Sequence, residues 1–116
     1  MRFDLEKRTT DFAKRVIRLC HALPKNSVNA RLSGQAVGSA GSIGANYREA
    51  NDAVGKKDFV LRLKIARREA KECLHLLELV SEANPILSKR MTKLQQEANE
   101  LNKILSAIII KSTRQS

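Results

Sequence analysis

The chain has 116 residues, of which 42% are hydrophobic and 29% charged, so it can bury a core, and one domain over residues 1–116 is expected. Lysine and arginine (22) outnumber aspartate and glutamate (12), and the net charge of +10 indicates a polyanionic partner, nucleic acid in preference to a membrane surface. We expect no membrane span, because no apolar run is long enough, no signal peptide, and a reducing cytoplasmic location with both cysteines free.

The first predicted helix covers residues 4–23. Apolar side chains such as Phe12 and Val16 recur along it at steps of four and three residues, which place them on one helix face. Pro24 ends this helix, because proline cannot continue one. The short PKNS loop then supplies Asn26, or the serine after it, as the N-cap of the next helix.

The second predicted helix, residues 27–53, contains a glycine-rich stretch, SGQAVGSAGSIGANYREA. A phosphate-binding loop of the GxxxxGK[ST] kind is absent, because none of these glycines is followed by lysine. Helical steps continue through the stretch, so we predict that its small side chains let neighbouring helices approach closely. Each glycine costs a helix about 1 kcal/mol relative to alanine, so we expect close packing to offset the cost and this helix to be the most enclosed. The glycines are Gly34, Gly38, Gly41 and Gly44.

The third and fourth predicted helices cover residues 56–82 and 85–112. Both carry an apolar seam at steps of four and three residues, sustained over three heptads in the third helix. Gly55 is the expected N-cap of the third helix, and Pro85 stands at the first position of the fourth, where it costs no hydrogen bond. Four helical segments with short connections predict an all-α fold, an antiparallel up-down four-helix bundle.

Polar side chains lie on or beside the buried seam of the second helix. Buried polar groups need partners, so we predict a hydrogen-bonded network with Lys64 or Glu69 of the third helix. Its expected role is to fix the register of the helices and not to catalyse a reaction. The predicted members of this buried polar network are Gln35, Ser39, Asn46 and Glu49.

A second apolar line on the third helix and three consecutive isoleucines near the C-terminus suggest apolar surface that needs a partner. The alternative is a wide stripe that faces the core of a single chain. We expect an oligomer. The predicted interface residues are Leu61, Ile65, Leu76, Leu79, Ile109 and Ile110.

Basic side chains form two stripes, one on the first helix and one on the third. Glu69 and Glu72 interrupt the second stripe, so an ordinary solvated face is an alternative there. Aromatic residues make up only 3% of the chain, so contacts with nucleic acid are expected to be with phosphates, salt-dependent and little selective for sequence. The predicted nucleic-acid-binding residues are Lys7, Arg8, Lys14, Arg15, Arg18, Lys57, Lys64, Arg67, Arg68 and Lys71.

Catalytic and metal-binding motifs are missing from the sequence. Glu72 and His75 match one Glu-x-x-His element of a di-iron bundle, but such a site needs two elements and two further inward glutamates. The only other histidine, His21, has Arg18 three residues before it. No cluster has zinc spacing, and no GxSxG motif occurs. We therefore expect a protein that is not an enzyme and that holds no cofactor and no metal.

The stretch LSGQAVGSAGSIGANYREA, followed by KKDFVLRLKIARREAKECLHLLELV, resembles the four-helix-bundle protein family encoded in intervening sequences of bacterial large-subunit ribosomal RNA genes. The pattern SIxANYxEA, then DF, then KxxxAxxEAxE carries the resemblance, which covers most of the chain. Val37 and Gly38 stand where many relatives have a basic pair, and Gly55 where a serine cap is common.

This resemblance implies a four-helix bundle that assembles into a ring-shaped homo-oligomer, commonly a homopentamer. A related branch, the accessory variability protein of diversity-generating retroelements, binds nucleic acid and a reverse transcriptase. The resemblance implies no settled activity for the members encoded in ribosomal RNA genes.

Charge and resemblance together favour a non-enzymatic, basic, homo-oligomeric bundle that binds RNA or DNA backbone, linked to ribosomal RNA or to a nucleic-acid-processing partner such as a reverse transcriptase. The alternative is a protein–protein interaction scaffold with no role in nucleic-acid binding. A third hypothesis is a passenger of its genetic element with little selected activity.

Overall fold

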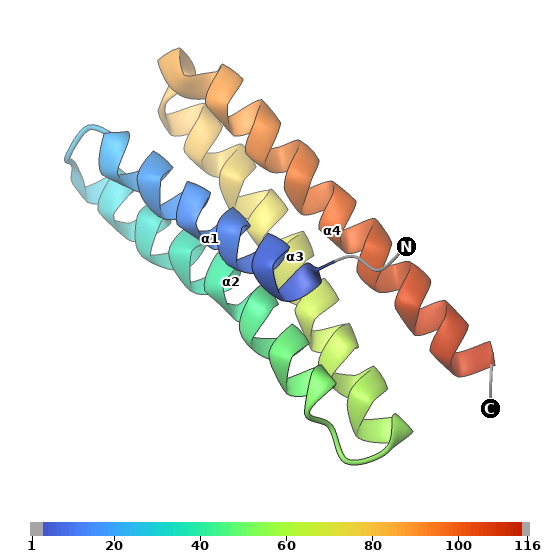
Figure 1. The fold of residues 1–116 in the computed structure, drawn as a ribbon. Coiled ribbons are helices and arrows are strands. Elements are labelled where there is room, and N and C mark those ends of the chain that lie inside the picture. Colours follow the sequence, from blue (N-terminus) through green and yellow to red (C-terminus); the bar gives the residue numbers. More distant parts are fainter. Residues whose placement is uncertain (1–3, 115–116) are drawn as a thin grey trace.

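The computed structural model describes residues 4–114, which form four long helices joined by short connections (Figure 1). Successive helices run in opposite directions, so the predicted all-α bundle of four helices is confirmed. Within these residues no helix combines the length and apolarity needed to cross a bilayer. The elements are α1 (Leu5–Ala22), α2 (Ser27–Asn51), α3 (Lys56–Ala83), the 3-10 turn η1 (Pro85–Leu87) and α4 (Ser88–Arg114).

The helix starts are set by residues that the sequence places there. The Asp4 carboxylate accepts a hydrogen bond from the backbone N–H of Lys7 at 3.0 Å and so caps α1. Asn26 caps α2 in the same way. Gly55 precedes α3 at a φ of +85°, a conformation that favours glycine. Pro85 begins η1, so the first turn before α4 is a 3-10 turn and not α-helical as expected.

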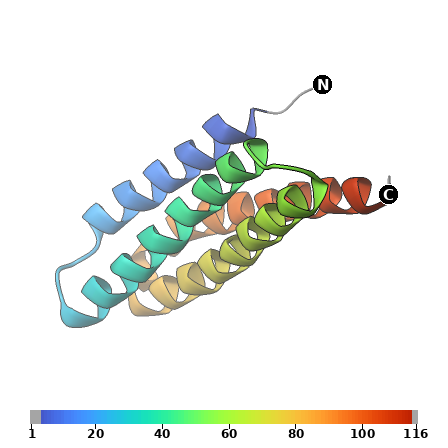
Figure 2. The same ribbon diagram turned by 90° about the horizontal axis from the view of Figure 1, so that it is seen from below.

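Residues from all four helices form the hydrophobic core, and they come from the predicted apolar seams. Helix α2 packs against α1 and α3, whereas α4 packs mainly against α3 and meets α1 along a thinner seam (Figure 2). Helix α1 has 18 residues against 27 in α4, so α4 extends beyond it. The largest fully buried side chains include Phe12, Leu19, Ile43, Leu63, Leu77, Met91, Leu101 and Leu105.

Close packing of the glycines in α2 occurs at one position only. A Cβ atom at Gly44 would lie 2.9 Å from the hydroxyl oxygen of Thr9 on α1. By contrast, Gly34, Gly38 and Gly41 are exposed, and a Cβ atom at any of them would have no atom within 4 Å. The side of α2 that carries these three glycines is therefore open, and the expectation that α2 is the most enclosed helix is wrong there.

The predicted buried polar network between α2 and α3 does not form as expected, because among residues 4–114 no hydrogen bond or ion pair joins its members to Lys64 or Glu69. Gln35 and Glu49 are exposed, and Glu49 forms an ion pair with Arg62 at 2.7 Å. Asn46 and Ser39 donate hydrogen bonds to carbonyl groups of their own helix. Asn46 is thus satisfied within its own helix. Ser39 also interacts with the Cys73 thiol of α3, and Arg62, the partner of Glu49, belongs to α3.

A different polar pair joins the helices at the end of the bundle near the α1–α2 loop. Asn29 of α2 and Asn84 after α3 are both buried and exchange two amide hydrogen bonds, of 2.9 and 2.8 Å. Their remaining donors reach the carbonyls of Pro24 at 2.8 Å and Val80 at 3.0 Å. The pair therefore ties the start of α2 and the loop before it to the end of α3.

The predicted oligomer interface divides between core and surface. Leu76 and Ile109 are each only 5% exposed, so their assignment to the surface is wrong, and here the wide core-facing stripe applies. Ile65 is half-buried. Among residues 4–114, the large apolar side chains that are exposed are Ile17, Val28, Val54, Leu61, Leu79, Ile86 and Ile110.

Candidate nucleic-acid interface

A basic hollow of about 300 Å³ lies on the seam between α1 and α4; we call it the α1–α4 cleft. Leu19 and Leu94 are buried and form its floor, and the charged side chains stand around them. The lining residues are Arg15, Arg18 and Leu19 of α1 and Arg90, Lys93 and Leu94 of α4.

The same short pattern on the two helices places these residues. On α1 the segment RVIRL, residues 15–19, has cations four and one positions before its core leucine. On α4 the segment RMTKL, residues 90–94, repeats this arrangement. Because α1 and α4 are antiparallel, the two segments face each other across the seam with an approximate local two-fold relation.

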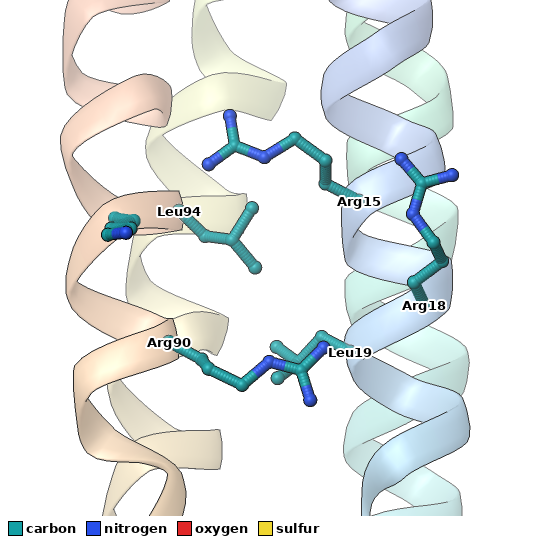
Figure 3. Close-up of a pocket in the computed structure, with 6 residues that line it drawn as sticks. Arg15, Arg18, Leu19, Arg90 and Leu94 are labelled. Atoms are coloured by element: carbon teal, nitrogen blue, oxygen red, sulfur yellow. The ribbon is translucent and has the colours of Figure 1, made fainter.

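Two arginines reach across the seam from opposite sides (Figure 3). The Arg15 side chain extends from α1 toward α4, near Leu94, and the Arg90 side chain extends from α4 toward Leu19. Arg18 runs along α1 instead. Arg15 is half-buried and Arg90 is exposed, so both guanidinium groups can present several N–H donors to an anion between the helices.

The cations of the cleft form no ion pair among residues 4–114. None of the five ion pairs found there involves Arg15, Arg18, Arg90 or Lys93. Four like charges around one hollow repel each other and focus a positive potential into it. An anion that enters the cleft would relieve this repulsion.

Toward the start of α1, the basic side chains are paired with carboxylates. Arg8 donates two hydrogen bonds of 2.8 Å to the Glu97 carboxylate of α4, and these bonds raise the pKa of the Arg8 guanidinium. Lys7 pairs with Asp11 at 2.6 Å, and its hydrogen bond lowers the pKa of the Asp11 carboxyl. Lys7 and Arg8, both predicted to bind nucleic acid, thus already have carboxylate partners. Arg15 and Arg18 form no ion pair among the described residues, although the charge of Arg18 also helps to lower the pKa of the Asp11 carboxyl.

The predicted basic stripe of α3 lies elsewhere on the molecule. Helices α1 and α3 are diagonal in the bundle and their backbones do not approach each other closely, so the two stripes do not join directly. Arg67 is half-buried and donates a hydrogen bond to the Ser106 hydroxyl of α4 at 3.4 Å. The exposed members of the stripe are Lys57, Lys64, Arg68 and Lys71.

Lys14, the remaining predicted residue, is exposed on α1 outside the cleft. Arg90 and Lys93 are not among the predicted residues, because the predicted basic stripes each follow a single helix. The signal that was available is the repeated pattern of cation, two residues, cation and leucine in RVIRL and RMTKL.

The chemistry that this arrangement offers is anion binding. Its lining is made of arginine, lysine and leucine, with no nucleophile and no general base. Glu72 and His75 are exposed on α3, and within residues 4–114 no three metal-ligating side chains come together.

Burial raises the pKa of Glu69 on α3, and the negative charge of the neighbouring Glu72 adds to the rise.

Comparison with known proteins places the chain in a family. Residues 2–107 match the family described as 23S rRNA-intervening sequence protein. The chain is also similar to a crystal structure from Bacteroides thetaiotaomicron, described as a protein with unknown function from the S23 ribosomal protein family. The identity is 31% and the TM-score 0.79, over 90% of this chain and 96% of that one. No curated protein matches. The resemblance seen in the sequence is confirmed, and the chain belongs to the family of 23S rRNA-intervening sequence proteins.

Proposed function

We propose that this protein is a non-enzymatic, basic, homo-oligomeric helical bundle that binds the phosphate backbone of RNA or DNA in the cytoplasm. The observation that carries the proposal is the α1–α4 cleft, where four cations from two helices surround one hollow and form no ion pair among residues 4–114. Arginine and lysine are the side chains that proteins use to bind phosphate. The description of the family supports a setting linked to ribosomal RNA. A partner that processes nucleic acid, such as a reverse transcriptase, is a further part of the proposal that only the sequence resemblance implies.

Binding through this site depends on phosphates and not on base edges. Each neutralised phosphate releases counterions, so affinity falls steeply as salt rises. The lining holds no aromatic ring on which a base could stack. The proposal therefore includes low sequence selectivity.

The test is a gel-shift assay that measures the affinity for generic RNA and for duplex DNA at about 50 mM and about 200 mM salt. Reversal of Lys14, Arg15 and Arg18 to glutamate is expected to abolish binding at both concentrations. The matched control is reversal of Lys57, Lys64 and Arg68 on α3, which changes the net charge equally and is expected to weaken binding less.

Absence of binding at low salt by the unchanged protein would contradict the proposal. If both triple variants lost the same affinity, the overall positive charge would explain binding, and the α1–α4 cleft would no longer be the proposed site.

The alternative function, a protein–protein interaction scaffold, draws on a separate observation. Apolar side chains such as Leu61, Leu79 and Ile110 are 40–53% exposed, and exposed apolar surface favours protein contacts. A scaffold that binds an acidic protein would retain that partner while failing to shift nucleic acid in the same assay.

The homo-oligomer is part of the proposal and has its own measurement. The exposed apolar residues of α3 support an interface between copies. A ring of five copies of the 13.0 kDa chain would have a native mass of about 65 kDa. Replacement of Leu61 and Leu79 by lysine is expected to shift that mass toward 13.0 kDa.

A further inference from the structure

The outer side of α3 is covered by no other helix of residues 4–114. Helix α3 packs against α2 and against α4, so its remaining side points away from the bundle (Figure 2). Leu61 and Leu79 lie on this side and are 53% and 40% exposed. Exposed positions recur at steps of three and four residues from Lys57 to Glu82, so they share one stripe of the helix. We call this stripe the outer face of α3.

The charges of the outer face are divided between its two halves. Its cations all stand at or before residue 71, and its carboxylates all stand at or after residue 72. None of the five ion pairs found among residues 4–114 involves any of them. The cations are Lys57, Lys64, Arg68 and Lys71, and the carboxylates are Glu72, Glu78 and Glu82.

This order of charges is unfavourable for a helix on its own. The N-terminal end of a helix favours carboxylates and the C-terminal end favours cations, but Lys57 and Glu82 stand in the first and last turns with the opposite signs. Lys64 and Arg68 repel each other, because they are like charges four residues apart. The same holds for Glu78 and Glu82. The stability of the single helix therefore does not account for the order, whereas a partner of matching charge would.

A second copy of α3, laid antiparallel against the first, has the matching order. When the two-fold axis passes at the level of Ala70, residues whose numbers add up to about 140 lie opposite each other. Leu61 then meets the partner's Leu79, and Arg68 meets the partner's Glu72. Lys57 lies beside the partner's Glu82. The two-fold axis repeats each of these contacts, so every pair occurs twice.

The spacing of these residues also makes them face each other. Leu61 and Leu79 are 18 residues apart, which is about five helical turns, so they point in the same direction from the helix. Lys57 and Glu82 are 25 residues apart, or about seven turns. Residues that share a direction on one helix meet across a two-fold axis perpendicular to both helices. The leucines and the terminal charges of the outer face therefore fit one register.

We infer that two copies of this protein associate through the outer face of α3, with their α3 helices antiparallel and Leu61 of each against the partner's Leu79. This inference rests on the homo-oligomer of the proposed function and names its contact surface. A contact whose two halves are identical closes with two copies, so the expected assembly is a dimer of about 26 kDa, twice 13.0 kDa. The face is about 38 Å long and one helix wide, so the interface is small and its dissociation constant is expected in the micromolar range.

Charge reversal tests the register. Arg68→Glu sets carboxylates against each other in both halves of the contact, and Glu72→Arg does the same with cations, so each should raise the dissociation constant of the dimer about tenfold or more. Arg68→Glu together with Glu72→Arg restores opposite charges and should return it to within about threefold of the unchanged protein. The control, Lys89→Glu on α4, changes the net charge as much as Arg68→Glu and should leave the constant nearly unchanged. Sedimentation equilibrium at about 50 mM salt measures all four variants, and circular dichroism should show each of them folded.

Disulfide formation tests the direction of the helices. Leu61→Cys and Leu79→Cys are prepared as separate samples, each with Cys20→Ser to remove the half-buried thiol. After mixing and oxidation they should form a covalent dimer, because opposite Cβ atoms come within reach of a disulfide. Either sample alone should remain a monomer on a non-reducing gel, since the two copies of one leucine lie about 27 Å apart along the helices.

Three outcomes would overturn the contact through α3 while leaving nucleic-acid binding in place. They are a mass near 65 kDa, as for the ring of five that the resemblance implies, a double reversal that recovers no affinity, and a disulfide in the Leu61→Cys sample alone. A mass of 13.0 kDa at every concentration would overturn the homo-oligomer as well. The gel shift of nucleic acid stays a separate measurement, because α1 and its cleft are diagonal to α3.

Discussion

The contact between Gly44 and Thr9 shows how one absent side chain lets α1 and α2 approach each other. The Thr9 hydroxyl donates a 2.6 Å hydrogen bond to the Leu5 carbonyl, and its side chain is buried, so it cannot easily move aside. The exposed Gly38 has no such neighbour. Gly44 of α2 therefore packs closely against α1, whereas Gly38 of the same helix has open space around it.

Replacement of these glycines by alanine should change stability in opposite directions. Gly44→Ala should lower the free energy of unfolding by about 1–3 kcal/mol, because the new methyl group overpacks against Thr9. Gly38→Ala should raise it by about 0.5–1 kcal/mol, because alanine is the better helix former and nothing opposes its Cβ atom. Urea denaturation measures both. A loss of stability in Gly38→Ala would contradict the exposed position and would mean that another copy packs against this side of α2.

The thiol of Cys73 supplies a prediction about pH. Burial raises its pKa to about 11 from an ordinary value of 9.0, and a hydrogen bond with Ser39 offsets part of the rise. Because the folded pKa lies above the unfolded one, the corresponding stability is present below pH 9.0 and is lost as the pH rises toward 11. The free energy of unfolding should fall across this window.

Cys73→Ala should remove the part of that decline that belongs to the thiol. A variant with an unchanged profile of stability against pH would contradict the assignment. At about pH 8 a thiol reagent should modify the half-buried Cys20 of the folded protein well before Cys73.

At the scale of helices, the amide pair of Asn29 and Asn84 replaces the polar network that was expected farther along α2. Asn29→Ala or Asn84→Ala should each lower the free energy of unfolding by about 1–3 kcal/mol, because the remaining amide is left buried without its partner. The double variant should lose less than the sum of the two. A double-mutant cycle from thermal or urea unfolding measures this coupling, and simple additivity would show that the pair does not act as a unit.

Local signals were sufficient to predict the four helices. Pro24, Gly55 and Pro85 mark the ends of segments, and the apolar seams between them give each helix its buried face. Such periodicity says which residues share a face of a helix, but not what lies opposite that face. This is why the glycine side of α2 was expected to be enclosed and why Leu76 and Ile109 were expected at the surface.

For the same reason, only the α1 wall of the candidate site could be predicted from the sequence. The arginines of α1 were identified as part of a basic stripe, but a cleft needs two walls, and the pairing of α1 with α4 is a property of the folded bundle. The matching segments RVIRL and RMTKL are visible in the sequence. Their significance depends on knowing that the two helices are antiparallel neighbours.

For the whole molecule, the thin contact between α1 and α4 makes the proposed ligand a stabiliser of the bundle. An RNA or DNA oligonucleotide at about 100 times its dissociation constant should add about 2.7 kcal/mol to the free energy of unfolding, or roughly 10 °C in melting temperature. Differential scanning fluorimetry measures this shift. A variant without Arg15 and Arg90 should show little of it, and an equal shift in that variant would contradict a ligand held between the helices.

The repeated segments that build the cleft have one more consequence. A site whose two walls are nearly equivalent by rotation looks almost the same to a strand that enters 5′ to 3′ as to one that enters 3′ to 5′. Such a protein would not sense the polarity of the chain it holds, and successive copies could occupy one transcript in either orientation.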